Sequence, residues 1–124
     1  MQVVFDVARV VLALYFLFNG VNHFAQWKGM TQYAAYKKVP AAGFMVILTG
    51  VMLLAGGASI LFGYSVTAGA VILAVFLVPT AFLMHNFWAE EDTMSRMNQM
   101  AHFLKNIALA AAVLLLPAIA DWSW

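Results

Sequence analysis

The chain has 124 residues, of which 65% are hydrophobic and only 9% are charged, and its mean hydropathy is +0.91. A soluble domain carries about 25% charged residues, and so short a chain cannot bury this much apolar surface, which excludes a water-soluble protein. The net charge of +1 excludes the basic field that nucleic acids require, and the absence of cysteine excludes disulfides and thiolate metal sites. We therefore expect an integral membrane protein that contacts the lipid bilayer.

Four apolar segments are long enough to cross a bilayer, which takes about 20 helical residues. The predicted helices cover residues 3–24, 41–62, 66–84 and 94–120. No basic region precedes the first apolar run and no cleavage site follows it, so we expect it to be retained as a span. Together the segments predict an all-α fold, an integral membrane four-helix transmembrane bundle in which residues 1–124 form a single domain.

The predicted helix 94–120 starts with several polar turns, and Asp92 or Thr93 is its expected N-cap. Its strictly apolar part, Ile107–Ile119, is too short to span a bilayer, so the polar turns must reach the headgroup layer or deeper. Burying polar groups in lipid is costly, so we expect the polar face to point into the bundle or an aqueous pocket. That face comprises Ser95, Asn98, Gln99, His102, Lys105 and Asn106.

The orientation follows from helix alternation, which places residues 25–40 and 85–100 on one membrane face and both termini on the other. Basic residues on the first face are Lys28, Lys37, Lys38, Arg96 and Lys105, whereas the second has only Arg9. The positive-inside rule then predicts a multi-pass protein with both loops cytoplasmic and both termini outside. Asp6 and Arg9, three residues apart in the first helix, are expected to pair with each other or to anchor to lipid.

Polar side chains from three helices should meet at the cytoplasmic end of this bundle, because each lies where its helix reaches that face. The candidate ligand-binding residues are His23, His85, His102, Lys105, Asn106 and Asn22. The simplest interpretation is structural, since such groups commonly hydrogen-bond neighbouring helices. A pocket for a quinone, a lipid headgroup or a small anion is the main alternative. A metal or haem site is less favoured, because no paired-ligand motif such as H-x-x-x-H occurs.

Several segments resemble the DoxX family of small four-helix membrane proteins, which is related to the DoxD subunit of thiosulfate:quinone oxidoreductase and to Surf4-type proteins. "ARVVLALYFLFNGVNHF" is similar to the opening of the family, and "GVMLLAG" to its second helix. "HNFW" followed by "HFLKNIAL" resembles the end of its third helix and the start of its fourth. Many members carry an acidic residue where Val46 stands here, so a role attached to that acid would be absent.

The resemblance implies an accessory or anchor subunit of a redox complex in the bacterial inner membrane. Such a subunit would anchor a redox protein and shape a pocket for a quinone or a substrate. The sequence shows no nucleotide loop, nucleophile–base pair or carboxylate pair, so we predict no catalytic residues and no catalysis by this chain alone. Two alternatives stay open: a small-solute carrier or channel, which a homo-oligomer would favour, and a factor for membrane-protein assembly or trafficking.

Overall fold

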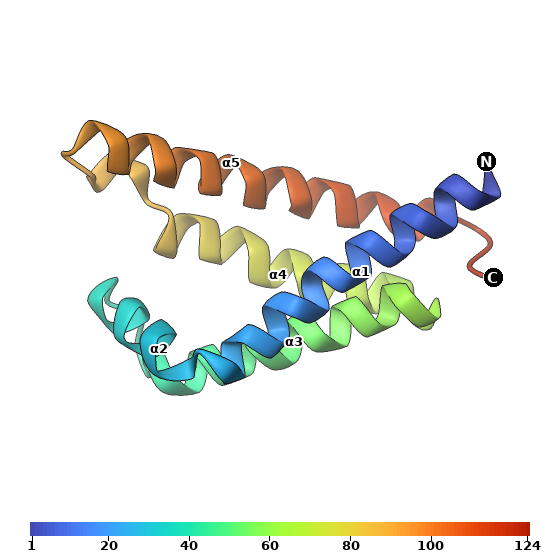
Figure 1. Ribbon diagram of the computed structural model, residues 1–124, viewed down its shortest axis with the longest axis horizontal. Coiled ribbons are helices and arrows are strands. Elements are labelled where there is room, and N and C mark those ends of the chain that lie inside the picture. The colour runs from blue at the N-terminus through green and yellow to red at the C-terminus, as the bar shows by residue number, and fades with distance from the viewer.

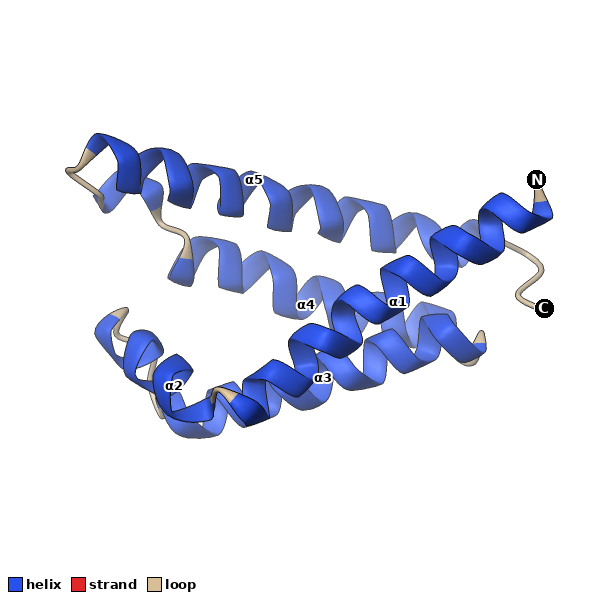
Figure 2. Ribbon diagram, in the orientation of Figure 1, coloured by secondary structure: helices blue, strands red, loops and turns tan.

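The computed structural model describes residues 1–124, and all of its regular structure is helical (Figures 1 and 2). The helices are α1 (Gln2–Ala25), α2 (Trp27–Tyr36), α3 (Ala42–Phe62), α4 (Val66–Met84) and α5 (Thr93–Leu115), with short 3₁₀ turns η1 (Phe87–Ala89) and η2 (Leu116–Ala118). Four of them, α1, α3, α4 and α5, are long and apolar enough to cross a membrane. The predicted all-α class with four spans is therefore confirmed.

The two ends of α5 have clear causes in the sequence. Asp92 is its N-cap, as predicted, and the Ser95 backbone N–H donates to the Asp92 carboxylate at 3.0 Å, which lowers the pKa of that carboxyl group. The predicted end at residue 120 is wrong, because the α-helix stops at Leu115 and continues as η2. Pro117 is the reason: it lacks an N–H group and cannot continue the α-helical hydrogen bonds, although Leu116 before it keeps helical backbone angles.

The helix α2 lies within residues 25–40, which the sequence analysis treated only as a polar connection. Its ten residues are too few to span a bilayer, and only Ala34 is buried. The helix ends before Pro40, where Lys38 and Ala41 take left-handed backbone conformations with φ of 64° and 49°. As a result α2 turns the chain through the polar end of the molecule before α3 begins.

The four long helices form two splayed pairs. α1 packs along α3, α4 packs along α5, and α3 joins the pairs by packing against α4. Both termini lie at the same end of the molecule, and the pairs diverge towards the end occupied by α2 and η1 (Figure 1). The buried core joins all four helices and includes Phe16, Leu53, Ile60, Leu73 and Val113. The end with α2 has no comparable core between the pairs.

Glycines allow the helices to approach closely within this arrangement, as is common in membrane bundles. A Cβ atom at Gly50 would lie 2.8 Å from the His23 Cβ atom, so α1 and α3 almost touch beside that histidine. A Cβ atom at Gly56 would collide with the side chain of Leu73 on α4. These glycines therefore fix the position of α3 against both of its neighbours.

Arg9 closes the end of the molecule where the termini meet. Its side chain is buried, and its three nitrogens donate to the carbonyl oxygens of Ile60 at 3.0 Å, Leu61 at 2.9 Å and Trp122 at 2.6 Å. The guanidinium also lies 3.8 Å from the ring centroid of Trp124. Two of the three acceptors belong to the last turn of α3, where carbonyls lack helical partners. Arg9 thus ties α1, α3 and the C-terminal segment together.

The predicted pairing of Arg9 with Asp6 or with lipid is wrong. Asp6 instead accepts a hydrogen bond from Gln2 at 2.9 Å, on the exposed side of α1. The cause is that Arg9 points into the bundle, where free carbonyls at the end of a helix satisfy a cation as well as a carboxylate does.

Candidate functional site

A cavity of about 840 Å³ lies between the splayed helix pairs, near the end with α2. Sixteen of its 27 lining residues are hydrophobic, and all five α-helices contribute to its walls. Phe16, Leu53 and Leu77, all buried, close it on the side of the core. Ligand pockets are commonly about 300–1,000 Å³ and mostly apolar with a few placed polar groups, so this cavity has the size and lining of a small-molecule site.

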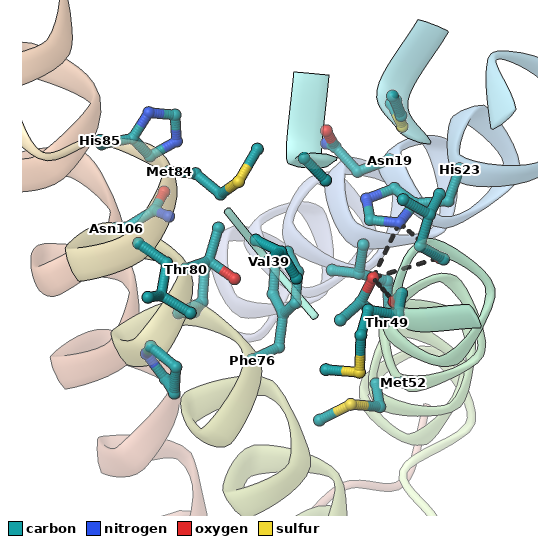
Figure 3. A pocket seen from close by; sticks show the side chains of 18 of the residues that line it. Asn19, His23, Val39, Thr49, Met52, Phe76, Thr80, Met84, His85 and Asn106 are labelled. Carbon is teal, nitrogen blue, oxygen red and sulfur yellow. Dashed lines mark hydrogen bonds between the residues drawn. The ribbon is translucent and has the colours of Figure 1, made fainter. Parts of the chain in front are cut away.

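One polar wall of the cavity comes from α1 and α3 (Figure 3). The His23 Nδ1 atom lies 2.9 Å from the Val46 carbonyl oxygen and 3.1 Å from the Thr49 hydroxyl. A carbonyl oxygen can only accept, so Nδ1 carries the proton and the neutral ring keeps Nε2 as an acceptor. The ring also meets Phe76 of α4 edge-on, with centroids 5.9 Å apart. His23 is therefore fixed in orientation by both helix pairs.

The opposite polar wall comes from α4 and the start of α5. His85 and His102 stack with ring centroids 5.1 Å apart and an interplanar angle of 25°. The His85 Nδ1 atom donates to the Gln99 Oε1 atom at 2.8 Å, which orients the ring. Lys105 lies one turn further along α5, on the same face as His102. Two imidazoles and an ammonium group thus face one side of the cavity.

Asn106 is the most buried polar residue of this wall, since the residue is only 4% exposed. Its carboxamide hydrogen-bonds to no other protein group, but its polar atoms stay open to the cavity, because Thr31 Oγ1 is the one fully buried polar side-chain atom without a partner. Figure 3 shows Asn106 beside Thr80 and below His85, across the cavity from Thr49 and His23. An amide that faces a cavity can donate and accept hydrogen bonds, so this group is available to a bound molecule.

The short helix α2 crosses the mouth of the cavity and is linked by polar bonds to the α4–α5 pair. The Tyr33 hydroxyl accepts from the Gln99 amide at 3.2 Å. Lys37 donates to the side-chain Oδ1 atom of Asn86 at 2.8 Å and forms an ion pair with Glu90 at 3.5 Å. These contacts hold α2 against the loop between α4 and α5.

The structure brings together most of the candidate residues from the sequence. His23, His85, His102, Lys105 and Asn106 all line the cavity, whereas Asn22 does not. Sequence reasoning missed Tyr33, Thr49 and Thr80 as lining residues. The threonines interrupt otherwise apolar spans, and this was the available signal. Within the chain, no three His, Asp or Glu side chains are grouped in a way that could hold a metal ion.

Comparison with known proteins places these observations in a family. The DoxX family model matches residues 4–86. The inner membrane protein YqjF of Escherichia coli K12 is 34% identical over 110 residues, which cover 89% of this chain and 78% of YqjF. The inner membrane protein YphA of the same organism is 28% identical over 110 residues, which again cover 89% of this chain and 78% of YphA. No solved structure matches the chain. With two thirds of its length matched by the family model, the chain belongs to the DoxX family.

Proposed function

We propose that this DoxX-family protein is an accessory subunit of a redox complex in the bacterial inner membrane, and that its cavity holds a quinone. The observation that carries the proposal is the Asn106 amide, which has no protein partner and faces a mostly apolar cavity. A quinone is an apolar ring whose carbonyl oxygens accept hydrogen bonds. It therefore matches both the lining of the cavity and the missing partner of this amide.

The position of the cavity supports binding over conduction. A channel or carrier would need polar groups to continue through the membrane, but beyond Phe16 and Leu77 the interior is a packed apolar core. Thr49 and Thr80 line the cavity, and Thr67 does not. A molecule could enter from the α2 end or between the helix pairs and would stop at the core. This favours an anchor with a bound cofactor over a transport path.

We further propose that the α2 end faces the cytoplasm, because five of the six basic residues lie on that side. In intact cells, a cysteine that replaces Ser123 should react with a membrane-impermeant thiol reagent, and one that replaces Gly29 should not. Both positions are exposed, and the native chain has no cysteine to interfere. Labelling of both positions after lysis is the control. Reaction at position 29 alone in intact cells would reverse the orientation.

The test of the proposed function compares the native protein with the Asn106→Leu variant, each purified from native membranes in a mild detergent. We expect the native protein to carry bound quinone and a redox protein, both identified by mass spectrometry. The variant should lose most of the quinone. Without ligand its unfolding temperature should stay close to that of the native protein, since the amide hydrogen-bonds to no protein group and leucine has a similar size.

Asn98→Leu is the matched control, because Asn98 lies on the same helix but is exposed and does not line the cavity. It should leave quinone content unchanged. A native protein that purifies alone and without quinone would contradict the redox-subunit proposal. An Asn106→Leu variant that is less stable than the native protein would show that the amide serves the fold instead.

A further inference from the structure

The cavity contains no acidic side chain. Of the five acidic residues in the chain, none is among its lining residues, whereas Lys105 and all three histidines are. The acids are Asp6, Glu90, Glu91, Asp92 and Asp121. Formal charge inside the cavity can therefore only be zero or positive. This asymmetry is a property of the cavity alone, since the chain as a whole is close to neutral.

The acidic groups at the same end of the molecule are engaged elsewhere. Glu90 pairs with Lys37, and the Asp92 carboxylate caps α5 by accepting from the Ser95 N–H group. Glu91 is exposed in the loop before α5. None of them is within ion-pairing distance of Lys105, because the Lys37–Glu90 contact is the only salt bridge in the structure. Lys105 thus has no anionic partner from its own chain.

Lys105 lies well inside the membrane-facing part of α5. It follows Thr93 by 12 residues, which is roughly 18 Å along a helix, and every polar residue of α5 except Asn106 precedes it. An ammonium group at such a position is costly unless it finds an anion or reaches the interface. Asn106, the next residue, supplies an amide that has no protein partner and is open to the cavity in the same wall. Two donors that lack protein partners are therefore adjacent in the cavity.

We infer that the cavity selects a molecule with an acidic head, a carboxylate on a single apolar tail, over neutral or cationic molecules of the same shape. Lys105 and Asn106 bind the carboxylate oxygens, with His102 beside them, and the tail lies against apolar lining such as Met52, Phe76 and Leu83. Charge-assisted hydrogen bonds from an ammonium group are stronger than those between neutral groups, which gives the selection. This inference goes beyond the proposed function. It rests on the same premise, that the cavity binds a largely apolar molecule, but it names an anionic class of ligand, whereas a quinone is neutral.

The experiment measures binding of radiolabelled dodecanoate and dodecanol, which share one tail, to the protein in phosphatidylcholine nanodiscs, with empty nanodiscs subtracted. At about pH 9 the carboxyl group of dodecanoate is ionised. We expect dodecanoate to bind about tenfold more tightly than dodecanol after correction for partitioning into lipid. Lys105→Met should abolish this preference, and Lys105→Arg should keep it.

Lys28→Met is the matched control, because it removes one positive charge from the same end of the molecule without touching the cavity. It should leave the preference unchanged. Two cavity-filling variants, Thr80→Phe and Met52→Trp, should block both probes, which locates binding in the cavity even if one of them folds poorly.

The outcomes separate the two proposals. Equal binding of dodecanoate and dodecanol, with both blocked by the filling variants, would overturn the acidic-head inference and leave an apolar binding site intact. A preference for dodecanoate over dodecanol that survives Lys105→Met would also overturn the inference, because Lys105 would then bind lipid phosphate and not the carboxylate. Absence of saturable binding by either probe would contradict both the inference and the proposed binding function.

Discussion

Replacement of Arg9 by methionine is expected to lower the free energy of unfolding by about 3 kcal/mol, roughly 1 kcal/mol for each carbonyl group that loses its donor. The three acceptors are the carbonyls of Ile60, Leu61 and Trp122, and the guanidinium is only 3% exposed, so water cannot replace it. Methionine is similar in length but donates no hydrogen bond. Denaturant titration of the purified protein in detergent, followed by circular dichroism, measures the change.

Two variants control this prediction. Arg9→Lys keeps the charge but lacks the planar fork that reaches three acceptors at once, so it should recover only part of the loss. Arg96→Met removes an exposed arginine whose side chain makes no hydrogen bond or ion pair, and it should change stability by less than about 0.5 kcal/mol. If Arg9→Met were as stable as Arg96→Met, Arg9 would not hold the termini and α3 together.

Substitution of Gly56 by alanine should be the second most disruptive single change, with a loss of about 1–3 kcal/mol. The new methyl group would overlap the side chain of Leu73, which is completely buried between helices and has no space to move into. Relief requires α3 and α4 to separate, and this would weaken the contact that joins the two helix pairs. Thermal unfolding of the purified variant measures the loss.

Gly29→Ala is the matched control, because a Cβ atom there would meet nothing within 4 Å. Alanine favours a helix over glycine by about 1 kcal/mol, so this variant of α2 should be neutral or slightly more stable. A Gly56→Ala variant that behaves like Gly29→Ala would show that the α3–α4 contact tolerates an extra methyl group.

The fold could be predicted largely from composition, because the membrane makes apolar runs directly readable as spans. The first three predicted spans differ from α1, α3 and α4 by at most one residue at each end. The helix α2 was missed because its ten residues mix polar, aromatic and small side chains in a pattern too short for helical periodicity to stand out. Its burial rests on Ala34 alone, which no local pattern would single out.

The site was only partly predictable, for reasons that individual residues make clear. His23, His85 and His102 could be brought together from helix alternation, since each lies at the same end of its helix. The partners of Arg9 could not be predicted, because they are backbone carbonyls 51 to 113 residues away, and a backbone carbonyl carries no sequence signature. Asn22 shares a helix end with His23, but which of two neighbouring side chains faces the cavity depends on the rotation of α1 against α3.

The two ends of the molecule are closed by bonds of different kinds. At the termini, Arg9 donates hydrogen bonds to main-chain carbonyls beside an apolar core. At the other end, α2 connects the helix pairs through side chains: Tyr33 bonds to Gln99, and Lys37 bonds to Asn86 and Glu90. The end at the termini is therefore the rigid one, and the α2 end is the one that can open. Separating the helix pairs there breaks side-chain hydrogen bonds that water can replace, so the fold can admit a bound molecule without disturbing its core.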